Sequence, residues 1–253
     1  MLGVLKPIIE FIAEIGRIIL FLLTALRQVF TRRPVYEETL RQTWFVGVET
    51  MPMVIVIATF IGTNLALQGY HAFAQISGQS LVGIFVALAG FREMAPIVAG
   101  ICLATKVGAS IASEIAVMRI KEQIDAMEVM AVNPYWFIIA PRFLAIIFCA
   151  PLMIIFANFF CMLSGYVVAV YQLGIDPTSY LTTVTTHLEV LDIGYSIIKG
   201  CVFGLVICLL SCYYGFNASM GAEGVGAASN RAIVTSCLTC FVANVYMTQV
   251  MYG

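Results

Sequence analysis

Residues 50–91 read TMPMVIVIATFIGTNLALQGYHAFAQISGQSLVGIFVALAGF, and they contain no Lys, Arg, Asp or Glu. A membrane-spanning helix needs about 20 mostly apolar residues. This stretch is therefore long enough for one span, a turn and the start of a second span. Polar and small residues at 68–71 and 77–80 mark the turn, so we expect spans at 46–67 and 81–106.

The rest of the 253-residue chain shares this character. Apolar residues make up 61% of it, against about 45–50% in soluble domains, and charged residues only 11%. Further runs with little or no charge predict spans at 143–172, 193–216 and 232–252. We expect an all-α integral membrane protein that forms one domain over residues 1–253. The net charge of −1 and the lack of a basic tract argue against a nucleic-acid partner.

The basic residues between the expected spans all fall on one side of the membrane. They are Arg32, Arg33, Arg41, Arg119, Lys121, Arg142 and Arg231. The segments 68–80 and 172–192, on the other side, contain no Lys or Arg. Because cytoplasmic loops carry an excess of Lys and Arg, the basic side is expected to be cytoplasmic. The N-terminus then lies in the cytoplasm and the C-terminus on the outer face.

The N-terminal segment 5–30 has a different pattern. Its polar residues form a stripe along a helix, and apolar residues cover the remaining surface; the polar residues are Lys6, Glu10, Glu14, Arg17, Thr24, Arg27 and Gln28. This pattern predicts a helix that lies in the cytoplasmic interface of the membrane. A sixth span is the alternative. A cleaved signal peptide is not indicated, because the start of the chain lacks positive charge.

No catalytic motif is recognisable in the chain. The eight cysteines all lie in apolar segments, and the pair Cys237–Cys240 has neither a second CxxC nor a nearby His, so packing is a better interpretation than a metal or redox site. The GxxxxGK[ST] phosphate loop does not occur. We therefore expect no cofactor, no metal and no enzyme activity, and any ATP hydrolysis must come from a separate subunit.

Residues 120–130, IKEQIDAMEVM, concentrate charge in a chain that has little of it. The expected topology makes this segment cytoplasmic. Its spacing predicts an amphipathic helix at 119–132, ended by Asn133-Pro134. Three acidic residues to one Lys match an anionic membrane surface poorly. Docking to a soluble protein is therefore favoured, and a solvated loop helix is the alternative.

Three stretches of this sequence resemble one protein family. Residues 91–145, which begin FREMAPIVAG and include the charged helix, resemble the signature region of MlaE/YrbE-type permeases. GAEGVGAASNRAIV at 221–234 is similar to the last cytoplasmic loop of that family, and LALQGY at 65–70 is similar to the end of its first span. The resemblance runs in order through essentially the whole chain. One departure is Thr105-Lys106, where a small residue or Gly followed by Arg is more usual.

The resemblance implies the permease subunit of an MCE-associated ABC transporter that moves phospholipid in the bacterial inner membrane. It identifies the charged helix as the coupling helix, with Glu122, Asp125 and Ala126 seated in a cleft of the ATPase subunit. It also implies an MCE-domain protein at the outer face, a STAS-domain accessory protein and a second copy of this chain as partners.

Charged residues also occur inside the expected spans. Arg92 and Glu93 lie within the second span and Lys199 within the fourth. Each would cost about 2.5–3.5 kcal/mol or more at the bilayer centre, and adjacent helical residues point about 100° apart, so Arg92 and Glu93 cannot simply pair. Lys199 is the expected partner of Glu93. Two roles remain possible for these charged residues: a buried structural ion pair, or a polar lining of the substrate path. The resemblance favours the polar lining.

Two other functional classes are considered. A secondary transporter or channel would use Arg92, Glu93 and Lys199 and would work from this chain alone. An intramembrane enzyme would need a nucleophile–base pair, and none is recognisable. For the lipid itself, the resemblance implies an apolar cavity between spans 1 and 2 at the dimer interface. The residues expected to line it are Leu65, Tyr70, Phe73, Ile76 and Met94.

Overall fold

A computed structural model describes residues 2–29, 36–75, 78 and 81–253, with the side chains of residues 2–12, 26, 28 and 29 outside the described part. All regular structure in these residues is helical. The helices are α1 (Leu2–Val29), α2 (Tyr36–Trp44), α3 (Met51–Ala74), α4 (Val82–Phe85), α5 (Ala95–Leu103), α6 (Ala109–Ile120), α7 (Gln123–Val129), α8 (Ala140–Val167), α9 (Pro177–His187), α10 (Val190–Phe216) and α11 (Ala222–Tyr252). Wider π-helical segments join several of them, namely η1 (Phe45–Glu49), η3 (Val86–Met94), η4 (Ala104–Gly108), η5 (Tyr135–Ile139) and η6 (Val168–Gln172).

Five continuous helices in the described part are long and apolar enough to cross a membrane. They are Tyr36–Ala74, Val82–Ile120, Tyr135–Gln172, Val190–Phe216 and Ala222–Tyr252. This confirms the all-α membrane protein with five spans. Each helix begins or ends beyond its expected span, because hydropathy marks only the part suited to hydrocarbon and a helix can continue into the polar interface.

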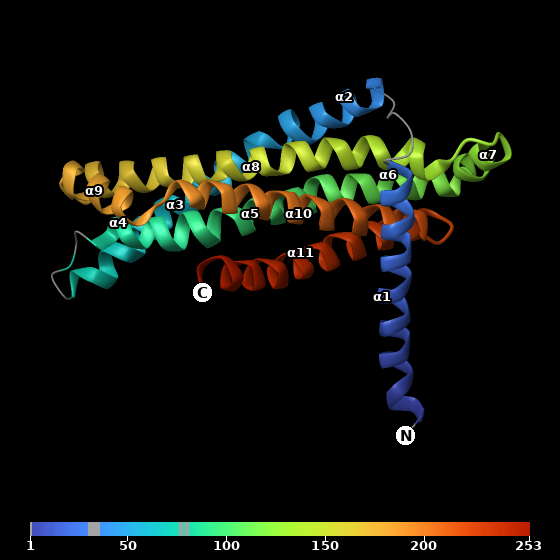
Figure 1. Cartoon of the computed structure of the whole chain (residues 1–253), viewed down its shortest axis with the longest axis horizontal. Coiled ribbons are helices and arrows are strands. Elements are labelled where there is room, and N and C mark those ends of the chain that lie inside the picture. The colour runs from blue at the N-terminus through green and yellow to red at the C-terminus, as the bar shows by residue number, and fades with distance from the viewer. Residues whose placement is uncertain (1, 30–35, 76–77, 79–80) are drawn as a thin grey trace.

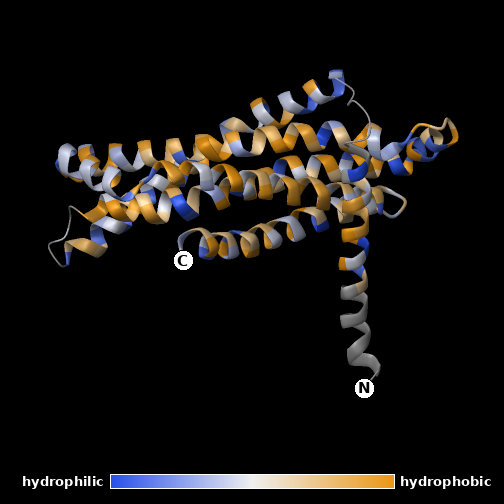
Figure 2. Cartoon of the chain, in the orientation of Figure 1, coloured by the Kyte–Doolittle hydropathy of each residue, from blue (hydrophilic) through white to orange (hydrophobic). Residues whose placement is uncertain are grey.

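The five spans lie roughly side by side, and two ends of the bundle can be distinguished (Figure 1). We call them the α7 end, where the short helix α7 protrudes, and the α9 end, which carries α9. Helix α1 runs across the spans near the α7 end (Figure 1), as expected for a helix lying in the membrane interface. Apolar residues cover most of the length of the bundle, and hydrophilic residues gather near the α7 end (Figure 2).

Aromatic contacts fasten α1 to the bundle. The ring of Phe21 lies 5.5 Å from that of Tyr135, 5.7 Å from that of Tyr213 and 5.7 Å from that of Phe216. Tyr135 begins the third span and the other two lie at the end of the fourth. Such ring pairs contribute about 0.5–1.5 kcal/mol each beyond the area they bury. The interfacial helix is therefore held at the place where two spans emerge beside α7.

Helix α8 is the central element of the bundle, because it packs against α2, α3, α5 and α10. The approach between α8 and α10 is close enough to require glycine. A Cβ at Gly200 would lie 2.5 Å from the Cα of Pro151. Without a difference in hydrophobicity between lipid and protein, membrane helices associate largely through such close packing of small residues.

We predict that Gly200→Ala destabilises the fold by about 1–3 kcal/mol, because the added methyl group must displace the backbone of α8. The free energy of unfolding of the purified protein in mixed micelles measures this. The matched control is Gly194→Ala on the same helix, where a Cβ meets nothing within 4 Å. The control is expected to be neutral or to gain up to about 1 kcal/mol from helix propensity. Equal stability of the two variants would contradict the packing described for α8 and α10.

Candidate functional site

A cluster of charged and polar side chains lies in the half of the bundle nearer the α9 end. We call it the polar cluster, and it consists of Arg92, Asp192, Lys199, Thr248 and Tyr252. The guanidinium group of Arg92 donates hydrogen bonds to the carboxylate of Asp192 at 3.2 Å and to the His187 carbonyl oxygen at 3.1 Å. It also lies 4.4 Å from the centre of the Tyr252 ring. These contacts join the second, fourth and fifth spans.

Lys199 completes the cluster by an unusual contact. Its ammonium group donates to the main-chain carbonyl oxygen of Arg92 at 2.6 Å and to the hydroxyl of Thr248 at 2.8 Å. In a regular α-helix the Arg92 carbonyl would accept from the N–H of residue 96. That residue is Pro96, which has no N–H. Lys199 donates to this carbonyl, which lacks the α-helical donor, and only 1% of the Lys199 surface is exposed.

The sequence predicts Glu93 as the partner of Lys199. In the structure the partners of Lys199 are the Arg92 carbonyl and Thr248. Glu93 is near enough to interact electrostatically with Lys199, but it is exposed and belongs to none of the four ion pairs among the described residues. The carboxylate partner of Arg92 is Asp192, which the sequence placed in an outer loop. Its position seven residues before Lys199, on the same helical face, was the available signal.

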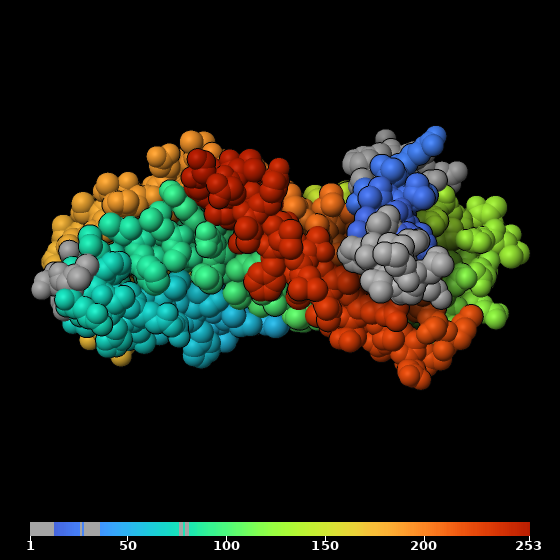
Figure 3. All heavy atoms as spheres, turned by 90° about the horizontal axis from the view of Figure 1, so that it is seen from below, coloured from blue at the N-terminus to red at the C-terminus, as the bar shows by residue number. Residues whose placement is uncertain are grey.

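Glu93 and its neighbour Met94 therefore face outward from the second span. They lie in η3, and π-helical turns in membrane and soluble helices often occur at functional sites. The first and fifth spans, which both contact the second, are the least buried of the five. Figure 3 shows α11 lying along the outside of the bundle. The segment η3, which contacts both of these largely uncovered spans, thus exposes a carboxylate that has no ion-pair partner in the described part of the chain.

The residues expected to line a lipid cavity are not all on this face. Met94 is exposed, but Leu65 is buried, and a Cβ at Gly90 would lie 3.2 Å from its Cδ1 atom. Phe73 packs edge to face on Phe85, with the ring centres 6.3 Å apart. Tyr70 is half-buried beside His71, and Ile76 lies outside the described residues. Lipid contact by these residues stays a prediction.

A lysine also links the first two spans. Lys106, the departure from the family pattern, donates to the main-chain carbonyl oxygen of Glu49. Glu49 ends the π-helical segment η1, three residues before Pro52. The Lys106 side chain thus has a defined partner in this fold.

The charged segment at the α7 end is two pieces rather than one helix at 119–132. Helix α6 ends at Ile120, Glu122 adopts a left-handed backbone conformation with φ 56°, and α7 begins at Gln123. An ion pair of 2.6 Å between Arg119 and Asp125 bridges the break. Ile124 is buried and anchors α7 to the bundle. The break lets α7 turn away from the direction of the second span.

The outward side of α7 is available to a partner. Glu122 and Ala126 are not covered by the bundle, and the apolar side chains of Val129 and Met130 that follow are exposed. Asp125 is less free, because its carboxylate is held by Arg119. An exposed acidic and apolar surface on a short rigid helix fits a cleft in a soluble protein better than it fits a headgroup layer.

Comparison with known proteins gives a consistent result. The family model described as Permease MlaE matches residues 39–250. A Rickettsia felis protein named as a probable ABC transporter permease protein is 36% identical over 248 residues, which are 98% of this chain and 95% of that protein. The intermembrane phospholipid transport system permease protein MlaE of Haemophilus influenzae is 28% identical, with 98% and 95% covered. A probable ABC transporter permease protein of Synechocystis is 30% identical, with 85% and 82% covered.

We predict that Lys199→Met destabilises the protein by about 1.5–3 kcal/mol, the range for hydrogen bonds that involve a charged group. Part of that loss should disappear in a Pro96→Ala background, because the alanine introduced there restores an N–H that can donate to the Arg92 carbonyl and removes the need for Lys199. A double-mutant cycle on the free energy of unfolding measures the coupling, expected at about 0.5–3 kcal/mol. Lys106→Met serves as the control and should show no coupling to Pro96→Ala. Strict additivity for Lys199 and Pro96 would refute the described role.

Proposed function

This chain belongs to the MlaE permease family and is an ABC transporter permease subunit, and we propose that it moves phospholipid between the inner membrane and an MCE-protein conduit in the cell envelope. The observation that carries the proposal is the family match across four of every five residues, which includes all five spans and α7. The phospholipid substrate is supported by the name of the Haemophilus influenzae relative.

The ATPase belongs to a separate subunit, which binds the exposed side of α7 through Glu122, Asp125 and Ala126. The basic residues Arg119, Lys121 and Arg142 lie beside α7 in sequence, which supports a cytoplasmic α7 end. The N-terminus is then cytoplasmic, and the C-terminus after the fifth span faces the periplasm. An MCE-domain protein would meet the α9 end, and a STAS-domain accessory protein is expected on the cytoplasmic side from the family resemblance alone.

Two copies of the chain would enclose the lipid path. The half-covered first and fifth spans, with Glu93 and Met94 between them, form a face that a second copy can cover. An unpaired carboxylate in hydrocarbon is expensive, so this face favours an enclosed, partly wet cavity over contact with lipid tails. Arg92 and Lys199 would support the cavity wall from behind, and Leu65, Tyr70, Phe73, Ile76 and Met94 are proposed to shape its outer part.

The geometry offers a route from the ATPase to this cavity. The second span is one continuous helix from Val82 to Ile120, and it ends directly before α7. Met94 and Ile120 are 26 residues apart, or about 40 Å along the helix. A displacement of α7 by the ATPase would move this helix and hence the side chains of η3. Such a movement transports lipid only if the two cavity states bind lipid with different affinity.

We predict that Glu122→Lys combined with Ala126→Arg prevents binding of the ATPase subunit, because it reverses charge and adds bulk on the outward side of α7. Co-purification of the ATPase with the tagged permease should fall by about 100-fold, the equivalent of roughly 2.7 kcal/mol. The control is Glu223→Lys, the same type of charge reversal at an exposed residue outside α7. Full retention of the ATPase by the double variant would rule out α7 as its docking site.

A further inference from the structure

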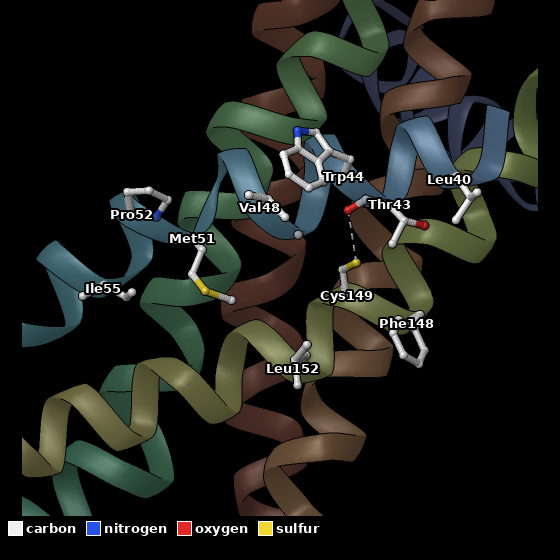
Figure 4. Close-up of a pocket in the computed structure, with 11 residues that line it drawn as sticks. Leu40, Thr43, Trp44, Val48, Met51, Pro52, Ile55, Phe148, Cys149 and Leu152 are labelled. Atoms are coloured by element: carbon white, nitrogen blue, oxygen red, sulfur yellow. Dashed lines mark hydrogen bonds between the residues drawn. The ribbon is translucent and has the colours of Figure 1, made fainter. Parts of the chain in front are cut away.

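A groove of about 490 Å³ lies on the side of the bundle formed by the first span and α8. Its lining residues come from two stretches, 40–55 and 148–152. Figure 4 shows these residues on the two helices, with Cys149 directed toward Thr43 and Met51 toward Leu152. The volume is within the roughly 300–1,000 Å³ of small-molecule pockets. It is separate from the proposed cavity, because neither Glu93 nor Met94 lines it.

The floor of the groove is made of small groups whose polar atoms already have partners. Gly47 leaves the floor open, and a Cβ there would lie 3.3 Å from the Cys149 sulfur. The Cys149 thiol donates to the Thr43 carbonyl oxygen at 3.7 Å, as the dashed line in Figure 4 shows. The Thr43 hydroxyl donates to the Thr39 carbonyl oxygen at 2.7 Å. A ligand in this groove therefore meets an apolar surface.

The walls are bulky apolar side chains that remain exposed. Trp44 and Val48 stand on the side of the first span, and Phe148 and Leu152 on the side of α8. Exposed walls around a glycine floor give a channel that is open along its length. A long, flexible hydrocarbon fits this shape better than a rigid helix, which needs a flat row of small residues for close approach.

The length and depth of the groove match one leaflet of the membrane. Leu40 and Ile55 are 15 residues apart, or about 22 Å along a helix. One leaflet, counted with its polar interface, is about 20–22 Å thick, of which about 15 Å is hydrocarbon. Ile55 lies near the middle of the hydrophobic segment 46–67, so the groove runs from the interface at the α7 end to the bilayer centre.

None of the described residues that line the groove is charged. Arg41, next to Leu40 in sequence, forms an ion pair of 2.7 Å with Glu38 and lines a separate pocket with Glu114 and Lys121. Trp44, which does line the groove, is a residue type enriched at the membrane interface. The groove therefore fits the hydrocarbon chain of a lipid and not its headgroup.

We propose that this groove binds one acyl chain of a phospholipid from the cytoplasmic leaflet. The site would hold a lipid laterally on each copy of the chain. The idea that the bound lipid is later transported rests on the proposed function. Lipid binding in the groove does not, because it needs neither ATP nor the ATPase. Lipid binding and lipid transport can therefore be tested separately.

The test uses the full-length chain in vesicles of phosphatidylethanolamine and phosphatidylglycerol, with a trace of phosphatidylethanolamine that carries a diazirine midway along one acyl chain. After irradiation, mass spectrometry maps the labelled peptides. Adducts are expected to concentrate on the two lining stretches, above the level at Phe159 and Leu163, which are exposed elsewhere on α8. Equal labelling of the groove and those two residues would mean ordinary bulk lipid and would overturn the proposal.

Two variants that fill the groove sharpen the test. Gly47→Leu occupies the floor, and Val48→Trp covers the opening from an exposed position that does not disturb packing. Each should lower groove labelling by about tenfold. Gly194→Leu is the matched control, because a Cβ there meets nothing within 4 Å, and it should leave labelling unchanged. The proposal would be contradicted if both filled variants were labelled as strongly as the unchanged protein. It would also be contradicted if labelling disappeared in the complete transporter because a polypeptide covers the groove.

Discussion

The hydrogen bond from Lys199 to the Arg92 carbonyl is the interaction on which the arrangement of the spans depends. Pro96 removes the donor that a regular helix would provide, and an unsatisfied carbonyl in a bilayer costs several kcal/mol. Lys199 repairs this defect and, in doing so, becomes a buried charge that must sit beside Arg92 and Thr248. Asp192 then balances Arg92. The contacts of Arg92 and Lys199 thus join the second span to the fourth and fifth.

This solution gives Arg92 and Lys199 their partners within the bundle and turns Glu93 outward. The cations of Arg92 and Lys199 are held inside the bundle, but the adjacent carboxylate of Glu93 is exposed on the side of a membrane span. Contact between this carboxylate and lipid tails would be energetically unfavourable. In the proposed function a second copy covers this face, and the cavity would lie next to the helix that leads to α7. Structure and transport are connected in this account by the second span, which carries the carboxylate at one place and ends at the docking helix.

The sequence was sufficient for the parts of the fold that follow from transfer free energies. Runs without charge located five spans, the polar stripe at 5–30 indicated the helix α1, and the charges at 120–130 located α7. It was insufficient where the answer depends on packing. The first span has little contrast between polar and apolar faces, and the signal that Leu65 points inward was instead the stripe of small residues Ala58, Gly62, Ala66 and Gly69 on its buried face. Asp192 looked like a loop residue because hydropathy does not reveal how far a helix extends. The break at Glu122 depends on a backbone conformation that no residue type required.

In the proposed function, this chain recognises lipid and a separate ATPase subunit supplies the energy. The most direct test is reconstitution of the purified permease in vesicles with and without its ATPase, followed by measurement of phospholipid movement. The account predicts movement only when both subunits and hydrolysable ATP are present. Phospholipid movement by the permease alone, driven by a proton or sodium gradient, would contradict it and would favour a secondary transporter built on Arg92, Glu93 and Lys199.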